Sequence, residues 1–485
     1  MEVNTLIVHI VDIFIDPFVC PWEVRREGTS MTIALALATF AYNLQTTPNS
    51  VRPAAMRAVF DLIGCAVSGT GTAGGTAGRK AAIHAWGRGP SSCWFSGERL
   101  TVPGAAFANS AIASMLDLDD GHRAASGHPG AGVIPAVIAT AEAIGASAER
   151  VLTAIAIGYE IGVRISAARD FRSLHTFDSG LWCGQGVAAA VGWLRGLSPE
   201  TIANAIAIAG TTAPGQTATG YTRLMGNNVK EGIAWATATG VTAVELAAHG
   251  FTGPTDFLDD ATRYDPSILT EALGERWHIE DVYFKLYSCC RWAHAAIDGI
   301  LEIKEQESIG PDEILAIRIS SFAQALSLNN DLAPPTLEAA QYSVPFCVAA
   351  AAVRGPDALL PLEVSTLSDR AVLDCARKIT LTVDPKLDTM FPSAVPARVE
   401  VESRKGVFSR TVTTPRGEST NPLGWDGIGK KFQLVARKRL SPSAVSGLIE
   451  AIAALEGGDL RPLLATLAAP DRSGSLAPAM LHAGA

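Results

Sequence analysis

The sequence predicts a mostly α-helical protein that contains one α+β segment. Apolar residues recur at helical spacing through residues 31–270, where alanine and glycine are frequent. Between residues 271 and 420, short runs alternate apolar and polar residues, as half-buried strands do. Helical spacing returns beyond Gly424. The predicted order is therefore helices, a mixed segment, and helices again.

Composition limits the classes of protein and of partner. A chain of 485 residues is long enough for roughly two to four domains. Its formal net charge is −9 and it has no basic block, which argues against a nucleic-acid partner. No apolar run has the length of a membrane span without a charge or a helix breaker, so we expect no membrane partner. The eight cysteines lack zinc-type spacing, which favours reduced thiols in the cytoplasm and no bound metal.

The first helical segment is predicted to be all α. Its helices are expected at residues 31–44, 51–67, 103–119, 131–146, 149–168, 184–194, 199–209 and 231–249. The glycine-rich run from Gly69 to Gly74 has the spacing of a dinucleotide-binding fingerprint. We reject that interpretation because the fingerprint needs a preceding strand, and the residues before it form a helical pattern.

The mixed segment is predicted to contain a small sheet and several helices. Strands are expected at 282–287, 314–320 and 378–383, and 397–402 should pair with 407–413; helices are expected at 289–306, 342–353 and 368–377. The predicted organisation is an extension at 1–30 that is poorly ordered, a helical domain at 31–270 and an α+β domain at 271–420. C-terminal helices at 421–468 and a flexible tail at 469–485 complete the chain.

The corner between residues 115 and 135 gathers titratable side chains in an otherwise apolar stretch. Asp117 and Asp120 are three residues apart, so a helix through residue 119 would put both carboxylates on one face. Gly121 suits the end of that helix, and Pro129 suits the first turn of the next. Between them lie His122, Arg123 and His128. This corner either holds a general acid or base with a shifted pKa or is a capped, salt-bridged corner.

A second cluster of reactive side chains lies between residues 284 and 298. Lys285 and Arg291 flank a predicted helix start, where free N–H groups and cations together suit an anion. Cys290 and His294 are four residues apart on that helix, which is compatible with a thiolate–imidazole pair or with a buried cysteine beside a buried histidine. Metal binding through these residues is disfavoured, because adjacent thiols bind one ion awkwardly and no second ligand pair is present.

Taken in order, six short pieces of the chain resemble the MmgE/PrpD family, which includes 2-methylcitrate dehydratase, cis-aconitate decarboxylase and iminodisuccinate epimerase. Each piece alone is common, but the ordered set is specific, and the likeness extends from Met31 to Leu467. The pieces are Phe60–Cys65 with Gly69, Asp117–Asp120, His128–Gly130, Arg195–Ser198, Gly250–Pro254 and Lys285–His294.

The resemblance implies a fold and a class of substrate. It implies a large helical domain built from both chain ends, a smaller inserted α+β lid domain, a homodimer and no cofactor. The site is expected between the helical domain and the lid, and the substrate is expected to be a small di- or tricarboxylate.

The resemblance also implies functional residues. Asp117, His128 and Lys285 match catalytic positions of the family. The family often has a His-Pro-Thr loop before an alanine-rich helix, and His175 stands near the place of that loop, with a two-residue difference in spacing. Tyr221 stands at the place of a family lysine, and Cys290 at the place of a family histidine. The remaining substrate-binding candidates are Arg223, Arg291, His122 and His294.

These residues predict proton transfer at a carbon atom beside a carboxylate. His128 would move the proton and be oriented by Asp117, while Lys285, Arg223 and Arg291 hold the substrate. The leading prediction is a cofactor-independent lyase acting on an aconitate- or citrate-like acid. An epimerase that uses Tyr221 or His175 as the second acid is the alternative, and a non-catalytic metabolite-binding protein is the alternative from another class.

Overall fold

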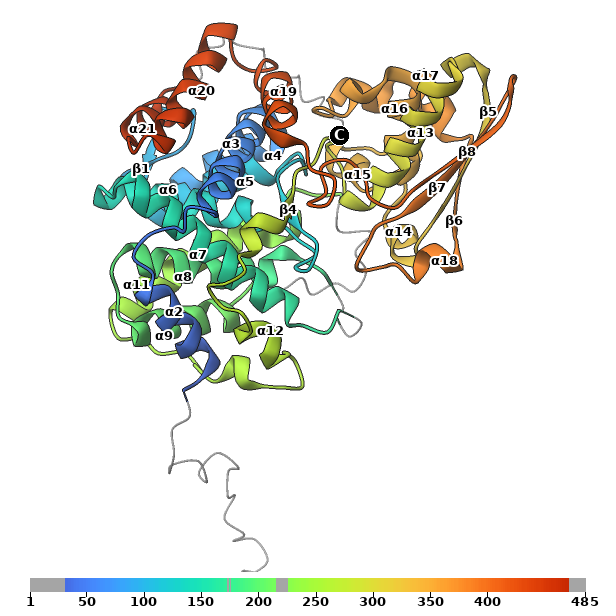
Figure 1. Ribbon diagram of the computed structural model, residues 1–485. Coiled ribbons are helices and arrows are strands. Elements are labelled where there is room, and N and C mark those ends of the chain that lie inside the picture. Colours follow the sequence, from blue (N-terminus) through green and yellow to red (C-terminus); the bar gives the residue numbers. More distant parts are fainter. Residues whose placement is uncertain (1–30, 172–173, 175, 215–225, 471–485) are drawn as a thin grey trace, which may run out of the picture. The chain divides into compact units, whose positions relative to one another are not determined.

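The computed structural model describes residues 31–171, 174, 176–214 and 226–470. Long helices form most of its first half (Figure 1): α2 (Ile33–Asn43), α3 (Arg52–Gly69), α4 (Ala73–Trp86), α5 (Val102–Ser114), α6 (Gly130–Ile144), α7 (Ala148–Ala167), α8 (Cys183–Leu194), α9 (Pro199–Thr211) and α11 (Ile233–Ala248). Ser147 and Ser198 cap α7 and α9 through their hydroxyl groups. Among the described helices, none combines the length and the apolar character that crossing a bilayer requires.

Helices from the far end of the chain pack on this group. α19 (Gly424–Ala436) and α20 (Pro442–Glu456) contact α3, and α21 (Arg461–Ala468) follows them. One hydrophobic core joins them to the first group, because it contains buried residues from Ala34 to Phe284 and again from Ile428 to Leu467. The mostly α-helical fold predicted from the sequence is confirmed.

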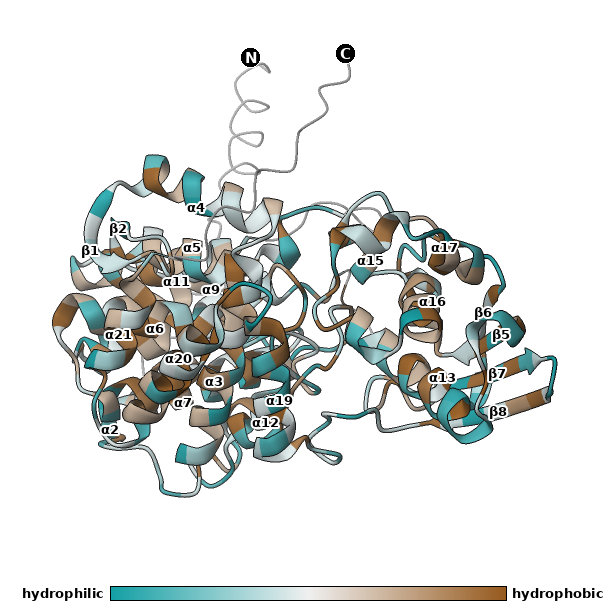
Figure 2. Cartoon of the chain, turned by 90° about the horizontal axis from the view of Figure 1, so that it is seen from above, coloured by the Kyte–Doolittle hydropathy of each residue, from teal (hydrophilic) through white to brown (hydrophobic). Residues whose placement is uncertain are grey.

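A four-stranded sheet lies in the part of the chain between these helices. Its order is β6 (Ile379–Val383), β5 (Ile314–Ser321), β7 (Ala397–Ser403) and β8 (Gly406–Val412). β5 and β6 are parallel, and the other two pairs are antiparallel, including the predicted β7–β8 hairpin. α13 (His294–Glu307) packs on β7, β8 and α16 (Val344–Arg354). Figure 2 shows apolar residues along α13 and α16, and they form a second core with the sheet.

Two short strand pairs occur outside the four-stranded sheet. β1 (Arg88–Ser92) pairs with β2 (Arg99–Leu100), and β3 (Gly121–His122) pairs with β4 (Val282–Tyr283). The prediction that the first segment is all α is therefore wrong in detail, and the strand expected at 282–287 has two residues. The β3–β4 pair matters for function, because it fixes the segment before Lys285 against the corner that follows α5.

Both predicted helix boundaries next to the reactive residues are wrong. α5 ends at Ser114, and Asp117 has a left-handed backbone with φ of 50°, which an α-helix does not accept. Asp117 and Asp120 therefore do not share a helix face. α13 begins at His294, after a 3₁₀ turn at Arg291–Ala293, and Cys290 is extended. Cys290 and His294 consequently do not lie on one helix.

Candidate functional site

Asp117 is a buried carboxylate that faces two buried ammonium groups. Its Oδ1 lies 3.1 Å from Nζ of Lys285 and 3.7 Å from Nζ of Lys230. Burial opposes ionisation of Asp117, but the two lysines outweigh it and hold its pKa below the usual range. Burial likewise opposes the charge on Lys285, yet Asp117 raises the pKa of Lys285 well above its usual value. Both groups are therefore charged at neutral pH.

The backbone around these groups is strained. Lys230, Glu231 and Gly232 are successive left-handed residues, with φ of 47°, 58° and 71°, directly before α11. A left-handed conformation costs a non-glycine residue roughly 1–2 kcal/mol, so packing must hold Lys230 and Glu231 in place. Lys230 is held by its side chain, because Nζ donates to Oε1 of Gln341 at 2.8 Å and to the hydroxyl of Tyr342 at 3.1 Å. Strain of this kind concentrates at functional sites.

The imidazole of His128 lies among carboxylates. Its Nδ1 is 3.0 Å from Oδ2 of Asp119 and 3.0 Å from the Asp120 carbonyl oxygen. Its Nε2 is 3.6 Å from Oδ1 of Asp117 and 3.9 Å from Oε1 of Glu231. The residue at the orienting nitrogen is thus Asp119, whereas the sequence interpretation gave that role to Asp117, which faces Nε2.

The carboxylates favour the protonated form of His128. Burial and the charge of Lys285 lower its pKa, but Asp119 and Glu231 together outweigh them, so the pKa of His128 is raised above its usual value. An imidazolium that is buried beside carboxylates is suited to donate a proton.

Glu231 is fixed by a serine that also binds the backbone of His128. The Ser179 hydroxyl donates to Oε2 of Glu231 at 2.8 Å and accepts from the His128 N–H at 3.0 Å. Ser179 opens a 3₁₀ turn, Ser179–Leu181, before α8. Because one hydroxyl contacts both residues, the positions of Glu231 and His128 are linked.

A second buried network supports the turn that carries Asp117 and Asp119. Nζ of Lys431, on α19, donates to the Leu118 carbonyl oxygen at 2.7 Å and lies 2.6 Å from Oδ1 of Asp61. Asp120 accepts from the Tyr159 hydroxyl at 2.6 Å. Burial raises the pKa of Asp120 to about 7, despite that hydrogen bond.

Asp117, His128 and Glu231 face a small polar pocket of about 30 Å³, roughly the space of one water molecule. It is lined by Asp117, Arg123, Ser126, His128, Glu231, Tyr283, Cys290, Arg291 and Trp292. Residues from both sides of the β3–β4 pair contribute, so the corner after α5 and the segment before α13 meet here. Lys285 does not line the pocket, but it meets His128 through Asp117, whose Oδ1 is 3.1 Å from Nζ of Lys285 and 3.6 Å from Nε2 of His128.

Two predicted substrate-binding residues have other partners. All five N–H groups of Arg291 are used: they donate to Glu418, to the carbonyl oxygens of Pro415 and Arg416, and to Nδ1 of His294. A guanidinium only donates, so Nδ1 of His294 is an acceptor, and burial lowers the pKa of this histidine well below its usual value. His294 is thus neutral and sits behind Arg291.

The thiol of Cys290 lines the pocket, but burial raises its pKa, which disfavours a thiolate.

His122 does not line the pocket. Its ring packs edge-on against His278 at 5.1 Å, and its two nitrogens have no hydrogen-bond partner within the described chain. His175, Tyr221 and Arg223 lie outside the described residues. Lys230 and Glu231, by contrast, are site residues that sequence reasoning missed. A lysine next to a glutamate before a helix is too common a pattern to indicate a functional site. Nothing in the sequence indicates that these two residues have a left-handed backbone.

Asp117, Asp119 and His128 lie close enough together to be considered as metal ligands, with candidate ligand atoms within 4.8 Å of one another. The lysines beside Asp117 argue against that use, because two ammonium groups within 3.7 Å of one ligand oxygen repel a cation.

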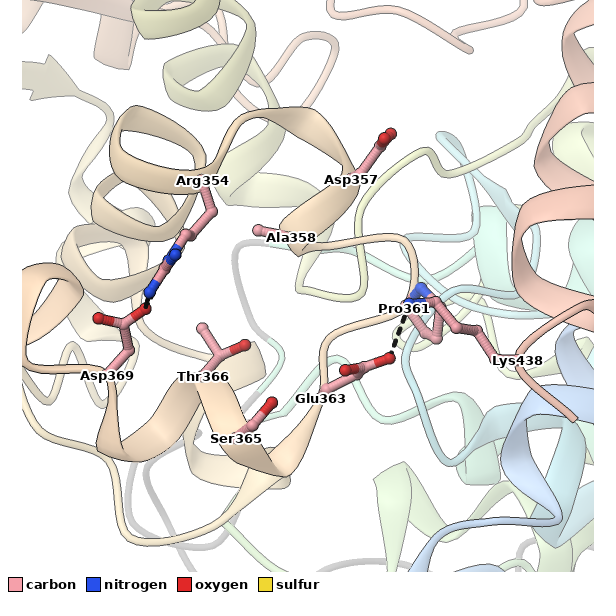
Figure 3. A pocket seen from close by; sticks show the side chains of 9 residues that line it. All are labelled: Arg354, Asp357, Ala358, Pro361, Glu363, Ser365, Thr366, Asp369 and Lys438. Carbon is pink, nitrogen blue, oxygen red and sulfur yellow. Dashed lines mark hydrogen bonds and ion pairs between the residues drawn. The ribbon is translucent and has the colours of Figure 1, made fainter. Parts of the chain in front are cut away.

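A larger hollow of about 500 Å³ shares no lining residue with this pocket (Figure 3). Both of its cations are paired with carboxylates: Nε of Arg354 is 2.6 Å from Oδ2 of Asp369, and Nζ of Lys438 is 2.8 Å from Oε1 of Glu363. Lys438 and Glu363 are each half exposed. The buried pocket, with its shifted pKa values, is therefore the candidate active site.

Comparison with known proteins gives the family. The MmgE/PrpD N-terminal domain matches residues 35–272, and the MmgE/PrpD C-terminal domain matches residues 287–457. A cis-aconitate decarboxylase of Aspergillus terreus is 26% identical over 417 residues, which are 78% of this chain and 83% of that protein. The cis-aconitate decarboxylase-like protein oryM of Aspergillus oryzae is 25% identical, covering 75% of this chain and 82% of its own length. The human cis-aconitate decarboxylase is 24% identical, covering 76% and 80%. Since both domains match in order over most of its length, the chain belongs to the MmgE/PrpD family.

Proposed function

We propose that the protein is a lyase that removes carbon dioxide from a small unsaturated polycarboxylate of the cis-aconitate type. The observation that carries the proposal is the placement of a proton-donating histidine, His128, beside a carboxylate held by two lysines. The relatives named as cis-aconitate decarboxylases support the same class of reaction.

The chemistry that these groups suit is protonation of a carbanion. When a β,γ-unsaturated acid loses carbon dioxide, the electron pair of the broken C–C bond forms a new double bond. The old double bond then delivers its pair to the carbon beside another carboxylate, and that carbon must receive a proton. Lys230 and Lys285 carry fixed positive charge that stabilises the enolate-like intermediate, and His128 in its protonated form supplies the proton.

Asp117 has a supporting role in this proposal. Its Oδ1 holds both ammonium groups in one place, with Nζ of Lys285 at 3.1 Å and Nζ of Lys230 at 3.7 Å. Since the pocket has about 30 Å³ and ligand sites span roughly 300–1,000 Å³, substrate entry requires it to widen.

An epimerase is supported less well. The sequence interpretation ranked it second, on the grounds that Tyr221 replaces a family lysine and Cys290 a family histidine, but Lys230 supplies a second lysine beside Asp117. Epimerisation needs proton transfer on two opposite faces of a carbon. The second acid that the sequence interpretation named for this reaction, Tyr221 or His175, lies outside the described residues.

Proton NMR of a polycarboxylate panel in deuterated water tests the proposal. The protein should convert cis-aconitate to a decarboxylated acid that carries one solvent deuterium on carbon. His128→Gln should abolish this conversion, while His249→Gln, at the exposed end of α11, should keep it. Dehydration of a citrate-like acid or deuterium exchange with inversion would replace the proposal with another reaction. Binding without any exchange at carbon would favour the non-catalytic alternative.

A further inference from the structure

A buried cluster of two arginines and one glutamate adjoins the candidate pocket. Nη2 of Arg123 donates to Oε1 of Glu418 at 2.7 Å, and Nη2 of Arg291 donates to Oε2 of the same carboxylate at 2.8 Å. Both guanidinium groups also lie over the ring of Tyr283, whose centroid is 5.2 Å from Cζ of Arg123 and 4.7 Å from Cζ of Arg291. Arg123, Arg291 and Tyr283 all line the pocket.

The backbone holds Glu418 in this position. Its neighbour Gly417 has φ of 89°, and a Cβ there would lie 2.0 Å from the carbonyl oxygen of Phe284, so only glycine fits. The Phe284 N–H donates to the Gly417 carbonyl oxygen at 2.9 Å. The glutamate is thus tied to the end of β4, next to Lys285.

The charges of the cluster do not cancel. Both arginines remain protonated, and although burial would raise the pKa of Glu418, they hold it below its usual value. Two positive charges and one negative charge leave a net +1. The cluster therefore presents one uncompensated positive charge at the pocket. Around Asp117 the charges balance, because Lys230, Lys285 and protonated His128 face the carboxylates of Asp117, Asp119 and Glu231.

The two arginines differ in how many of their N–H groups are left free to bind a ligand. Arg291 uses all five N–H groups within the protein, as described above. Arg123 uses Nε and Nη2 on Glu418, and within the described chain its Nη1 makes no hydrogen bond. Its side chain is 20% exposed, whereas that of Arg291 is 3% exposed. Arg123 is thus the member of the cluster with donors available for a ligand.

We propose that Arg123 is a specificity-determining residue, whose Nη1 group binds a substrate carboxylate other than the one that contacts Lys230 and Lys285. Glu418 and Tyr283 hold the guanidinium in the required orientation, and Glu418 limits the cluster to one carboxylate. This inference rests on the proposed function for the identity of the reacting substrate, but carboxylate binding at Arg123 is separable from turnover.

The test compares Arg123→Gln with Arg52→Gln. Arg52 is a matched control because it forms a partly buried ion pair with Glu149, remote in sequence from the pocket residues. A hydrogen bond between charged groups contributes enough for Arg123→Gln to raise KM for cis-aconitate about 10- to 100-fold. The change in kcat should be smaller, and Arg52→Gln should leave both constants as in the wild type.

Calorimetry with propane-1,2,3-tricarboxylate, which has no double bond to rearrange, separates binding from reaction. Its Kd should rise by the same factor in Arg123→Gln. If the wild type binds this acid but turns over no polycarboxylate, the proposed function fails and the inference stands. If KM and Kd of Arg123→Gln stay within twofold of the wild type, the inference is overturned.

A charge-retaining variant covers the case in which Arg123→Gln does not fold. Arg123→Lys keeps the positive charge but loses the planar fork that reaches Glu418 and a ligand together. It should raise KM and Kd several-fold, and values equal to those of the wild type would also overturn the inference.

Discussion

Asp119 Oδ2 lies 3.0 Å from Nδ1 of His128, on the side of the ring that faces away from Asp117. This pair explains why a buried histidine beside a lysine keeps its proton, since Asp119 contributes the largest increase to its pKa. If protonated His128 donates the proton, kcat falls as the pH rises through its pKa. The alkaline limit of kcat should therefore lie above pH 6.5.

Asp119→Asn should move the alkaline limit of kcat to lower pH. It should also reduce kcat about 100-fold at neutral pH, because His128 would lose both its proton and its orientation. The measurement is the pH dependence of kcat for both proteins. Asp120→Asn is the control for a nearby carboxyl without a hydrogen bond or ion pair to the ring, since the Asp120 carboxyl accepts from the Tyr159 hydroxyl and the Gly130 N–H. An alkaline limit that does not move in Asp119→Asn contradicts the assignment.

Lys285→Met should destabilise the fold and remove activity. The substitution leaves Asp117 buried with the more distant Lys230, and breaking a buried ion pair costs about 3–5 kcal/mol. Urea unfolding measures the loss. In the double variant Asp117→Asn/Lys285→Met the loss should be smaller than the sum of the single losses, because no charge is left without its partner. Additive losses would show that the pair is not coupled.

Lys431→Met tests whether α19 positions the turn that carries Asp117. Lys431 is buried with Asp61 and donates to the Leu118 carbonyl oxygen, so its loss leaves a buried carboxylate and a free carbonyl. The free energy of unfolding should fall by about 3–5 kcal/mol, and kcat should fall more than KM rises. Lys438→Met is the matched control, because its half-exposed pair with Glu363 contributes about 0–1 kcal/mol.

A Lys431→Met protein that is destabilised but keeps the wild-type kcat and KM would mean that Lys431 stabilises the fold without positioning the site.

Local patterns predicted the regular elements well. The β7–β8 hairpin was found from alternating residues around the turn at Arg404–Gly406, and the pairing in the structure follows it. Apolar spacing likewise located α3, α6 and α7. These elements depend on neighbours in sequence, which is the information that periodicity contains.

The helix predicted through Asp117 failed for a long-range reason. The carbonyl oxygens of Asp117 and Leu118 accept from Lys285 and Lys431, which are 168 and 313 residues away in the chain. These hydrogen bonds replace the backbone hydrogen bonds that a longer α5 would have made. Local helix propensity cannot predict them, because their donors lie far away in the sequence.

The candidate site was accessible from sequence to the extent that its residues are chemically conspicuous. Asp117, His128 and Lys285 were singled out and are brought together. Lys230 and Glu231 were not, because only their left-handed backbone directs them to Asp117 and His128. Glu418 was missed since its role exists only through the two arginines that it contacts.

The pH dependence of stability should reveal Asp120. Its pKa rises from 3.8 to about 7 on folding, so the folded protein binds a proton that the unfolded chain releases between these values. The stabilisation is complete below pH 3.8 and is lost as the pH rises through 7. Urea titrations at each pH should therefore show that the wild type loses more stability, or gains less, between pH 5 and pH 8 than Asp120→Asn, which cannot ionise. The two proteins must be compared because other buried groups titrate in this range: the raised pKa values of His128 and Asp178 act in the same direction, and the lowered pKa values of His122, His278 and His294 act in the opposite one. An equal change in Asp120→Asn would place the titrating group elsewhere and return Asp120 to an ionised partner of Tyr159.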